Sequence, residues 1–443
     1  MKKDWKAIKW LYDELPELVS EGVIGHDSAE ALRRRYGEVP PRDSSKLILT
    51  LFSILGALLV GAGLIMIVAH NWNILDRLAR TFVALLPLTA SLCALGFIYI
   101  RNETRAAIVE PLCAFQTLAL GAAMGIIGQT YNVGGEFSTL LLFWCVAAIP
   151  LAYIFDSVIA GSLCVGILSW HLCESYQALE SWQAWLGMAA VIPYVAKVML
   201  KERGSGRAAF LGWCAAIGTT ISVVDIFTFH SYGYSSSIEL LALPCFFSAL
   251  FFAGAIPEGP SLPAWRNPLR TAGAIGAGIM AIVISLDKYM DIRIWSPSYG
   301  VDALTYAFLA FCVAGVAILC MRRRFWDIPF GLVGLLAFVS SLCASPFGHS
   351  TYDPSLILQT VFSIAALALG VISMVSGVRE DSFGRLNGGI VIVMAWLIGK
   401  FFSSDLDFLF KGLLFIVLGG AFIAFNVMMI IKRRKASRKE VAA

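Results

Sequence analysis

The sequence predicts an all-α polytopic membrane protein, a bundle of about 14 transmembrane helices with a short cytosolic helical hairpin at its N-terminus. Hydrophobic residues make up 58% of the chain and charged residues 14%, with a mean hydropathy of +0.76. In soluble proteins about a quarter of all residues are charged. Apolar runs of about 20 residues recur along most of the chain, which is the length that a helix needs to cross the bilayer. Their continuity excludes the alternating pattern of a membrane β-barrel.

Residues 1–46 form the first predicted domain, a cytosolic amphipathic helical hairpin. Apolar residues recur at helical spacing in its first part, and Gly22 and Gly25 interrupt the run. Asp27 followed by Glu30 has the spacing of a capping box, which predicts that the second helix begins there with Asp27 as its N-cap. Because this domain is polar and precedes any apolar run, we expect no cleaved signal peptide.

The transmembrane domain is predicted over residues 47–431, followed by a basic cytosolic tail at 432–443. Lys and Arg are concentrated in alternate loops, and this bias predicts that both termini are cytoplasmic, in a bacterial inner membrane. The loops are too short to contain a soluble catalytic domain. The predicted spans are 47–69, 79–100, 107–128, 138–155, 157–172, 182–200, 208–229, 237–256, 269–286, 302–320, 326–344, 355–377, 387–402 and 408–431.

Cysteine and glycine in these spans are most simply packing residues. The ten cysteines lie in or at the ends of apolar runs without CxxC spacing, so we predict small core residues and neither disulfides nor metal ligands. Gly273, Gly276 and Gly278 in one span would let a neighbouring helix approach closely. We expect no metal and no cofactor.

Lys400, Asp405, Asp407 and Lys411 surround the predicted turn between the last two spans, on the non-cytoplasmic side where lysine is normally scarce. Asp407 and Lys411 have the i, i+4 spacing of a helical ion pair. One interpretation is a purely structural ion-pair cluster. The other is a binding site in which the two lysines attract a phosphate or carboxylate headgroup and the aspartates hold the lysines in place.

The segment GQTYNVGGEF follows an apolar run and contains Gln129, Asn132 and Glu136. Two glycines and an asparagine would permit the backbone to fold back into the membrane from outside, with exposed amides that could hold an anionic group. The alternative is an ordinary turn. We include Gln129, Asn132 and Glu136 among the candidate substrate-binding residues.

Ionisable side chains within the predicted spans are few, and such residues are functional candidates because their burial in lipid is costly. Asp225 and His70 lie at outer ends of spans and complete the candidate substrate site, while His171 lies at another outer end. Glu110 and Lys197 lie about one turn inside cytoplasmic ends, and Lys197 can extend its amine to the membrane surface. No carboxylate occupies the middle of a span, which argues against a proton-driven pump.

Several motifs resemble an uncharacterised family of bacterial membrane proteins, the domain of unknown function 2157 family. They are EGVIGHDSAEALRRRYG at 21–37, VAHNWN at 68–73, GQTYNVGGEFSTLLLFW at 128–144, RLNGG at 385–389, FFSSDLDFLFKGLLF at 401–415 and LGG at 418–420. The resemblance implies a multi-pass inner-membrane protein without an assigned activity. It also implies a companion, a smaller membrane protein with a GDYxxLxY motif. It supplies no catalytic residues.

Three functional hypotheses follow. The leading one is a transporter or flippase-like protein for an anionic or amphipathic envelope compound, which rests on the number of spans and the polar outer ends. The second is a non-catalytic scaffold or sensor subunit that acts with a partner protein. The third is a membrane-embedded, envelope-modifying enzyme with His70, His171 or Asp225 as a base, although no known catalytic motif is present. Membrane lipids are the expected partners and nucleic acid is not. The sequence leaves open whether the protein forms a homo-oligomer.

Overall fold

The computed structural model describes residues 5–36, 75–102, 105–175, 182–228, 237–257, 262–286, 299–344, 354–380 and 382–403, with the single positions 416 and 420. Every regular element in these ranges is a helix, which confirms the all-α class. The chain divides into two compact units, Met1–Arg80 and Thr81–Ala443, and each is described by itself.

The described part of the first unit contains the predicted helical hairpin. Helix α1 (Trp5–Ser20) and helix α2 (His26–Tyr36) are joined by a tight turn, in which Gly22 has a φ of +74°. A residue with a side chain is strained at this φ, so glycine suits the reversal. The Tyr12 hydroxyl of α1 donates a hydrogen bond to the main-chain carbonyl of Arg33 in α2, at 3.2 Å. The hairpin is therefore confirmed, while its cytosolic location stays a prediction.

The start of α2 differs from the predicted capping box. The Gly25 carbonyl accepts a hydrogen bond of 3.0 Å from the Ser28 amide, and the helix begins one residue before Asp27. Asp27 therefore lies in the first turn, where its negative charge still favours the helix dipole. Glu30 forms an ion pair with Arg34 at 3.1 Å, one turn along the helix. The prediction of Asp27 as N-cap is wrong because glycine occupies that position.

The helices of the second unit follow the predicted second to thirteenth spans to within about four residues. The predicted first and last spans, 47–69 and 408–431, lie outside the described residues. The helices are α4 (Arg77–Ile100), α5 (Ala106–Tyr131), α6 (Phe137–Phe155), α7 (Val158–Glu174), α8 (Trp182–Lys201), α9 (Gly206–Thr228), α10 (Ser237–Ala255), α11 (Pro268–Leu286), α12 (Tyr299–Met321), α13 (Ile328–Ala344), α14 (Pro354–Arg379) and α15 (Phe383–Ser403), with the short 3-10 helix η2 (Ala264–Arg266) before α11.

Eight of the described helices are long and apolar enough to cross a membrane, judged by length and composition. Helix α7 and the apolar parts of α10, α12 and α13 are shorter. The chain is thus a helical membrane protein with several apolar helices. The total of 14 spans stays a prediction, because the described residues include only part of it.

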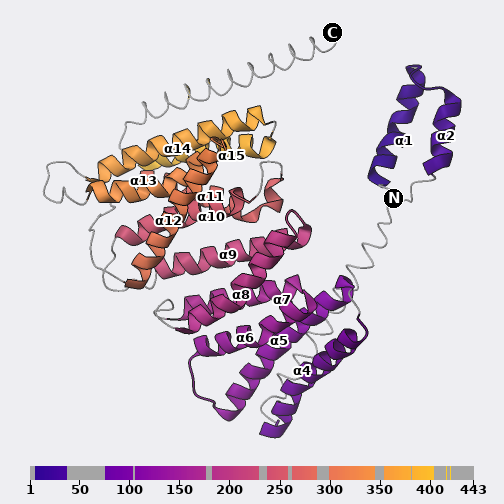
Figure 1. The fold of residues 1–443 in the computed structure, drawn as a ribbon, viewed down its shortest axis with the longest axis vertical. Coiled ribbons are helices and arrows are strands. Elements are labelled where there is room, and N and C mark those ends of the chain that lie inside the picture. Colours follow the sequence, from indigo (N-terminus) through magenta and orange to yellow (C-terminus); the bar gives the residue numbers. More distant parts are fainter. Residues whose placement is uncertain are drawn as a thin grey trace. The chain divides into compact units, whose positions relative to one another are not determined.

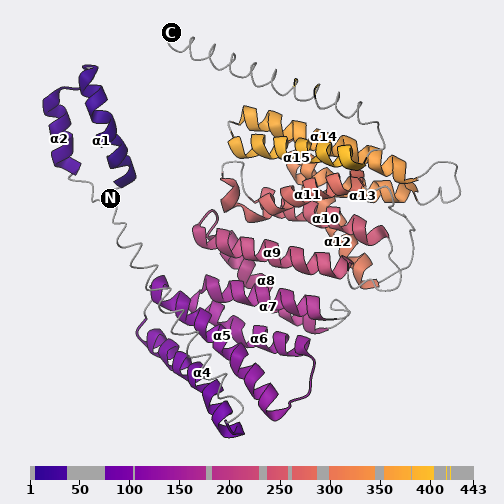
Figure 2. The same cartoon turned by 180° about the vertical axis from the view of Figure 1, so that it is seen from behind.

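Two hydrophobic cores share helix α9. Its first half, with Leu211, packs in a core formed by α4 to α8, and its second half, with Phe227, packs in a core formed mainly by α10, α11, α13 and α14. Figures 1 and 2 show α9 between these two groups of helices. A third, smaller core surrounds Phe252, whose ring fills the space that side chains at Gly315 and Gly331 would occupy. Helix α9 is therefore the element that joins the two halves of the second unit.

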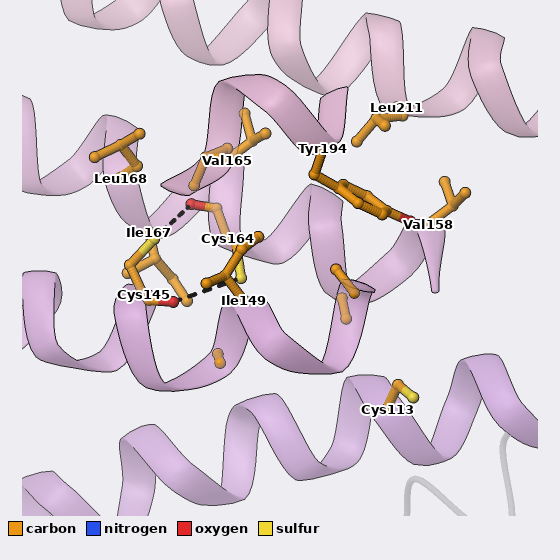
Figure 3. Packing of buried hydrophobic residues seen from close by; sticks show 14 of the residues in the cluster. Cys113, Cys145, Ile149, Val158, Cys164, Val165, Ile167, Leu168, Tyr194 and Leu211 are labelled. Carbon is orange, nitrogen blue, oxygen red and sulfur yellow. Dashed lines mark hydrogen bonds between the residues drawn. The ribbon is translucent and has the colours of Figure 1, made fainter. Parts of the chain in front are cut away.

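Helix α7 is the centre of the first core (Figure 3). Tyr194 of α8 is fully buried and lies so close to α7 that a Cβ at Gly161 would be 2.3 Å from its ring. The Cys145 thiol of α6 donates to the Cys164 carbonyl of α7 at 3.5 Å, and the Cys164 thiol points back at the Cys145 carbonyl at 4.0 Å. These contacts confirm the predicted core role for Cys145 and Cys164.

The prediction for cysteine holds for only part of the described set. Cys113, Cys245 and Cys312 are buried, as expected for small core residues, but Cys93 and Cys320 are exposed. Both exposed cysteines lie on apolar helices. In an apolar helix the outward side is exposed to lipid, so the type of residue alone does not predict burial.

Candidate functional site

Charged side chains gather where the connections after α4, α6, α8, α10, α12 and α14 meet, which we call the basic end of the second unit. Successive helices run in opposite directions, so these connections lie together (Figures 1 and 2). Arg203, after α8, donates a hydrogen bond to the Pro257 carbonyl, after α10, at 3.2 Å. Arg207, at the start of α9, donates to the Asp156 carbonyl between α6 and α7. Two ion-pair networks lie at this end.

The first network begins with Glu110, in the first turns of α5. Its carboxylate accepts hydrogen bonds from the Ser157 hydroxyl at 2.6 Å and from the Val158 and Ile159 amides, each at 3.0 Å. The side chain is only 14% exposed. The first amides of a helix have no partner within it, and a carboxylate there also favours the helix dipole. Glu110 therefore caps the N-terminus of α7 from a different helix.

Asp156 connects this cap to two further helices. It occupies the turn between α6 and α7 in a left-handed conformation, with φ at 51°. Its carboxylate accepts from Lys197 of α8 at 3.1 Å and from Arg207 of α9 at 3.3 Å. Arg207 also pairs with Glu202 at 3.1 Å and lies 3.9 Å from Glu110. The sequence predicts only that Lys197 extends its amine to the membrane surface, whereas in the structure this amine forms an ion pair with Asp156.

The ion pairs of Asp156 predict a dependence of stability on pH. Burial alone would raise the pKa of this carboxyl, but the hydrogen bond and charge of Lys197, with the charge of Arg207, hold the pKa below the ordinary value of 3.8. The unfolded chain therefore binds a proton at a higher pH than the folded protein does. The resulting stabilisation is fully present above about pH 4 and is lost as the pH falls through the folded pKa.

We expect Asp156→Asn to remove this stabilisation while tolerating the left-handed backbone, which asparagine adopts readily. Denaturant titrations in mild detergent should show the variant to be less stable than the wild type at pH 6. The difference should shrink as both proteins are brought toward pH 3. A difference that is the same at both pH values would contradict the ion-pair assignment.

The second network surrounds Asp327, at the connection between α12 and α13. Asp327 is 5% exposed, and its two carboxylate oxygens accept from Arg270 of α11 and from Arg324, each at 2.5 Å. Arg385 of α15 lies 3.9 Å from the same carboxylate and pairs with Glu380, after α14, at 2.5 Å. One buried carboxylate thus joins α11, α13 and α15, which are far apart in the sequence.

The C-terminus of α10 lies beside this network and is capped by side chains from other connections. Four successive carbonyls at the end of α10 each accept a hydrogen bond of 2.5–3.2 Å from a side chain. The last carbonyls of a helix have no partner within it, so these donors stabilise its end. The pairs are Asn267 with Gly254, Arg324 with Ala255, Arg322 with Ile256 and Arg203 with Pro257.

The segment that contains Gln129, Asn132 and Glu136 is an ordinary turn. Helix α5 continues through Gln129 to Tyr131, Asn132 caps it in a left-handed conformation with φ at 49°, and α6 begins directly after Glu136. The alternative of a re-entrant backbone is therefore wrong. Gln129, Asn132 and Glu136 are exposed at this turn.

His171, near the end of α7, is brought close to this turn but is not on an exposed face. It is fully buried, and its Nδ1 lies 2.7 Å from the Ser138 carbonyl of α6. The Ser138 hydroxyl donates to Glu136 at 3.3 Å, so Ser138 links the two predicted residues. His171 Nε2 has no hydrogen-bond partner among the described residues. His171 therefore lies near the end of its helix, as predicted, but is buried against α6.

Lys400 of α15 donates a hydrogen bond of 2.6 Å to the Ser285 carbonyl, in the last turn of α11. A cation at a helix C-terminus satisfies an unpaired carbonyl and favours the helix dipole. Asp225 is partly buried on α9. Asp405, Asp407, Lys411 and His70 lie outside the described residues. The substrate-binding role of all these residues stays a prediction.

The residues of the two networks were mostly missed by the sequence analysis. The sequence predicts Glu110 and Lys197 only as single ionisable residues and points to no functional role for Arg207 or Asp327. The sequence contains one local signal for the first network. Asp156 and Ser157 lie between two apolar runs, and both residue types are preferred N-caps, which predicts that a helix begins after them. Within the described ranges, no three His, Cys, Asp or Glu side chains lie together as metal ligands would.

Glu110 and Asp156 of the first network lie in a part of the chain that matches a family model. Residues 16–161 match the family model described as "Predicted membrane protein (DUF2157)". The predicted resemblance is therefore confirmed for about a third of the chain, which includes the end of α1, all of α2, Glu110 and Asp156. The motifs between 385 and 420 lie outside the matched residues. The chain matches no curated protein and no solved structure.

Proposed function

We propose that the protein moves an anionic or amphipathic envelope compound across a bacterial inner membrane, as a transporter or flippase. The observation that carries this proposal is the ion pairing at the basic end. There, charged side chains from helices remote in sequence form pairs at helix ends, and the pairs of the first network are partly exposed. Asp156, for example, has a side chain that is 44% exposed and holds α8 and α9. Such pairs can break and reform as helices separate, which suits a gate in alternating access.

The two cores support the same proposal. Transporters commonly work by movement of one helix group against another around a site between them. Here the groups α4–α8 and α10–α15 have separate hydrophobic cores, and among the described helices α9 is the one that the two cores share. In this proposal the basic end faces the cytoplasm with both termini. The substrate then interacts with the opposite end through Gln129, Asn132, Glu136, Asp225, Lys400, His70, Asp405, Asp407 and Lys411.

Exchange of a fluorescent anionic phospholipid between the leaflets of liposomes tests this proposal. We expect the reconstituted protein to accelerate exchange over protein-free liposomes. The double variant Asp156→Asn, Lys197→Gln should change the rate at least severalfold, because it weakens the proposed gate. The matched control is Arg101→Gln, an exposed arginine at the same end that stacks over Phe97 at 4.2 Å. If no gradient or lipid gives exchange above the protein-free rate, the lipid-moving role is excluded.

A scaffold or sensor that acts with a companion membrane protein is the second candidate. It is favoured by the hairpin, which lies in a compact unit of its own and whose helix α2 carries an exposed Glu30–Arg34 pair. Deletion of residues 1–40 distinguishes the two candidates. A transporter retains lipid exchange in liposomes without this segment, whereas a scaffold loses co-purification of its partner protein.

A further inference from the structure

Arginines outnumber carboxylates around Asp327. Besides the exposed Arg266 and Arg323, the described side chains at the connections from α10 to α15 include five guanidinium groups and two carboxylates, an excess of three positive charges. Asp327 cannot neutralise this excess, although three arginines lie within 3.9 Å of it. The arginines are Arg270, Arg322, Arg324, Arg379 and Arg385, and the carboxylates are Asp327 and Glu380.

The excess charge is partly removed from water. The side chains of Arg270, Arg324 and Arg385 are 13%, 16% and 21% exposed. Buried cations need a counter-charge because solvent no longer stabilises them fully. Arg385 Nη2 is buried and makes no hydrogen bond among the described residues. A guanidinium group presents a planar fork of donors that matches the oxygens of phosphate. The cluster therefore has both the charge and a spare donor for an anion.

Large apolar side chains lie next to these arginines in the chain and are exposed. Met321 precedes Arg322 and is 76% exposed, and Phe325 follows Arg324 and is 61% exposed. Phe383, at the start of α15, is 64% exposed. These apolar side chains would not contribute to the binding of a free phosphate. A lipid, in contrast, would place its headgroup at the arginines and its acyl chains against the apolar residues. The combination favours an amphipathic anion.

We propose that the arginine cluster around Asp327 binds the phosphate headgroup of an anionic phospholipid in the leaflet at the basic end. The headgroup sits against Arg379 and Arg385, with Arg270 and Arg324 held behind them by Asp327. This site is separate from the predicted outer site at Lys400. It requires no transport, so binding and lipid exchange can succeed or fail independently.

Native mass spectrometry of the full chain, released from phosphatidylcholine nanodiscs that contain some phosphatidylglycerol, tests the site. We expect the wild type to retain phosphatidylglycerol in preference to phosphatidylcholine. Arg379→Gln, Arg385→Gln should lower the retained fraction about tenfold. Glu380→Gln should raise it, because it removes the carboxylate that competes for Arg385. The two variants therefore shift the result in opposite directions, which general loss of folding would not do.

The matched control is Arg101→Gln, Arg266→Gln, which removes the same charge at the same end. These two arginines are exposed and stack over Phe97 and Trp265 at 4.2 and 4.6 Å. We expect the control to retain the lipid as the wild type does. Equal losses in the two double variants would overturn the proposal, since general surface charge would then explain binding. Displacement of the lipid by millimolar inorganic phosphate would overturn the lipid assignment in favour of free phosphate.

Discussion

Replacement of Glu110 by alanine is expected to destabilise the protein by about 3 kcal/mol. The substitution leaves the Ser157 hydroxyl and two amides at the start of α7 without the acceptor that they now have. It also removes a negative charge from a helix N-terminus and one of the carboxylates near Arg207. SDS titration of the purified protein, followed by tryptophan fluorescence, measures the loss. Glu110→Gln should recover part of it, because an amide oxygen still accepts one of the hydrogen bonds.

Glu174→Ala is the matched control for this prediction. Glu174 is the last residue of the same helix α7, and it is exposed. We expect its substitution to change stability by less than about 0.5 kcal/mol. If Glu110→Ala has an equally small effect, the cap on α7 is not needed for stability, and the capping account of the first network fails.

Gly273→Ala should cost about 3 kcal/mol, since the added methyl group has no room. A Cβ at Gly273 would lie 2.2 Å from the Phe251 amide nitrogen and 2.8 Å from the Phe247 carbonyl oxygen, so α10 and α11 would have to separate. Backbone atoms cannot move aside as the end of a flexible side chain can. We expect a lower midpoint in SDS titration and faster proteolysis of the purified protein.

The same helix supplies the control. A Cβ at Gly278 would meet only the side chain of Ile392, at 3.4 Å from Cδ1 and 3.5 Å from Cγ1, which are ordinary contact distances. Gly278→Ala should therefore be neutral or slightly stabilising, because alanine favours the helix by about 1 kcal/mol over glycine. Equal effects of the two substitutions would show that α10 and α11 do not approach as closely as described.

These glycines show what sequence can and cannot predict. The pattern Gly273, Gly276 and Gly278 predicts close helix packing, and the first two do contact α10, with Phe247 lying against Gly276. The sequence does not say which neighbour a face meets, so it could not separate Gly278 from the others. Helix positions were predictable for a related reason, because the need to span about 30 Å of hydrocarbon leaves a strong local signal.

The charged networks were less predictable because their members are distant in the chain. Glu110 lies on α5, Asp156 in the turn after α6 and Arg207 on α9, so they meet only once the helices have packed. Each of them alone is a common type of residue near the membrane surface, where a charged side chain costs little free energy. A local pattern could suggest that Asp156 and Ser157 begin a helix, but it could not identify Glu110 as the acceptor for that helix.

Helix α9 has a consequence for how the protein is made. The first core contains Ala208, Leu211 and Ala215 of α9, so helices α4 to α8 have an incomplete core until this helix has been synthesised. Arg207, which pairs with Asp156, enters at the same moment. During translation the first half of the second unit is therefore completed only by α9, whose other end packs in the core of the next half. Assembly of the two halves is coupled in time, with α9 as the last component of one and the first of the other.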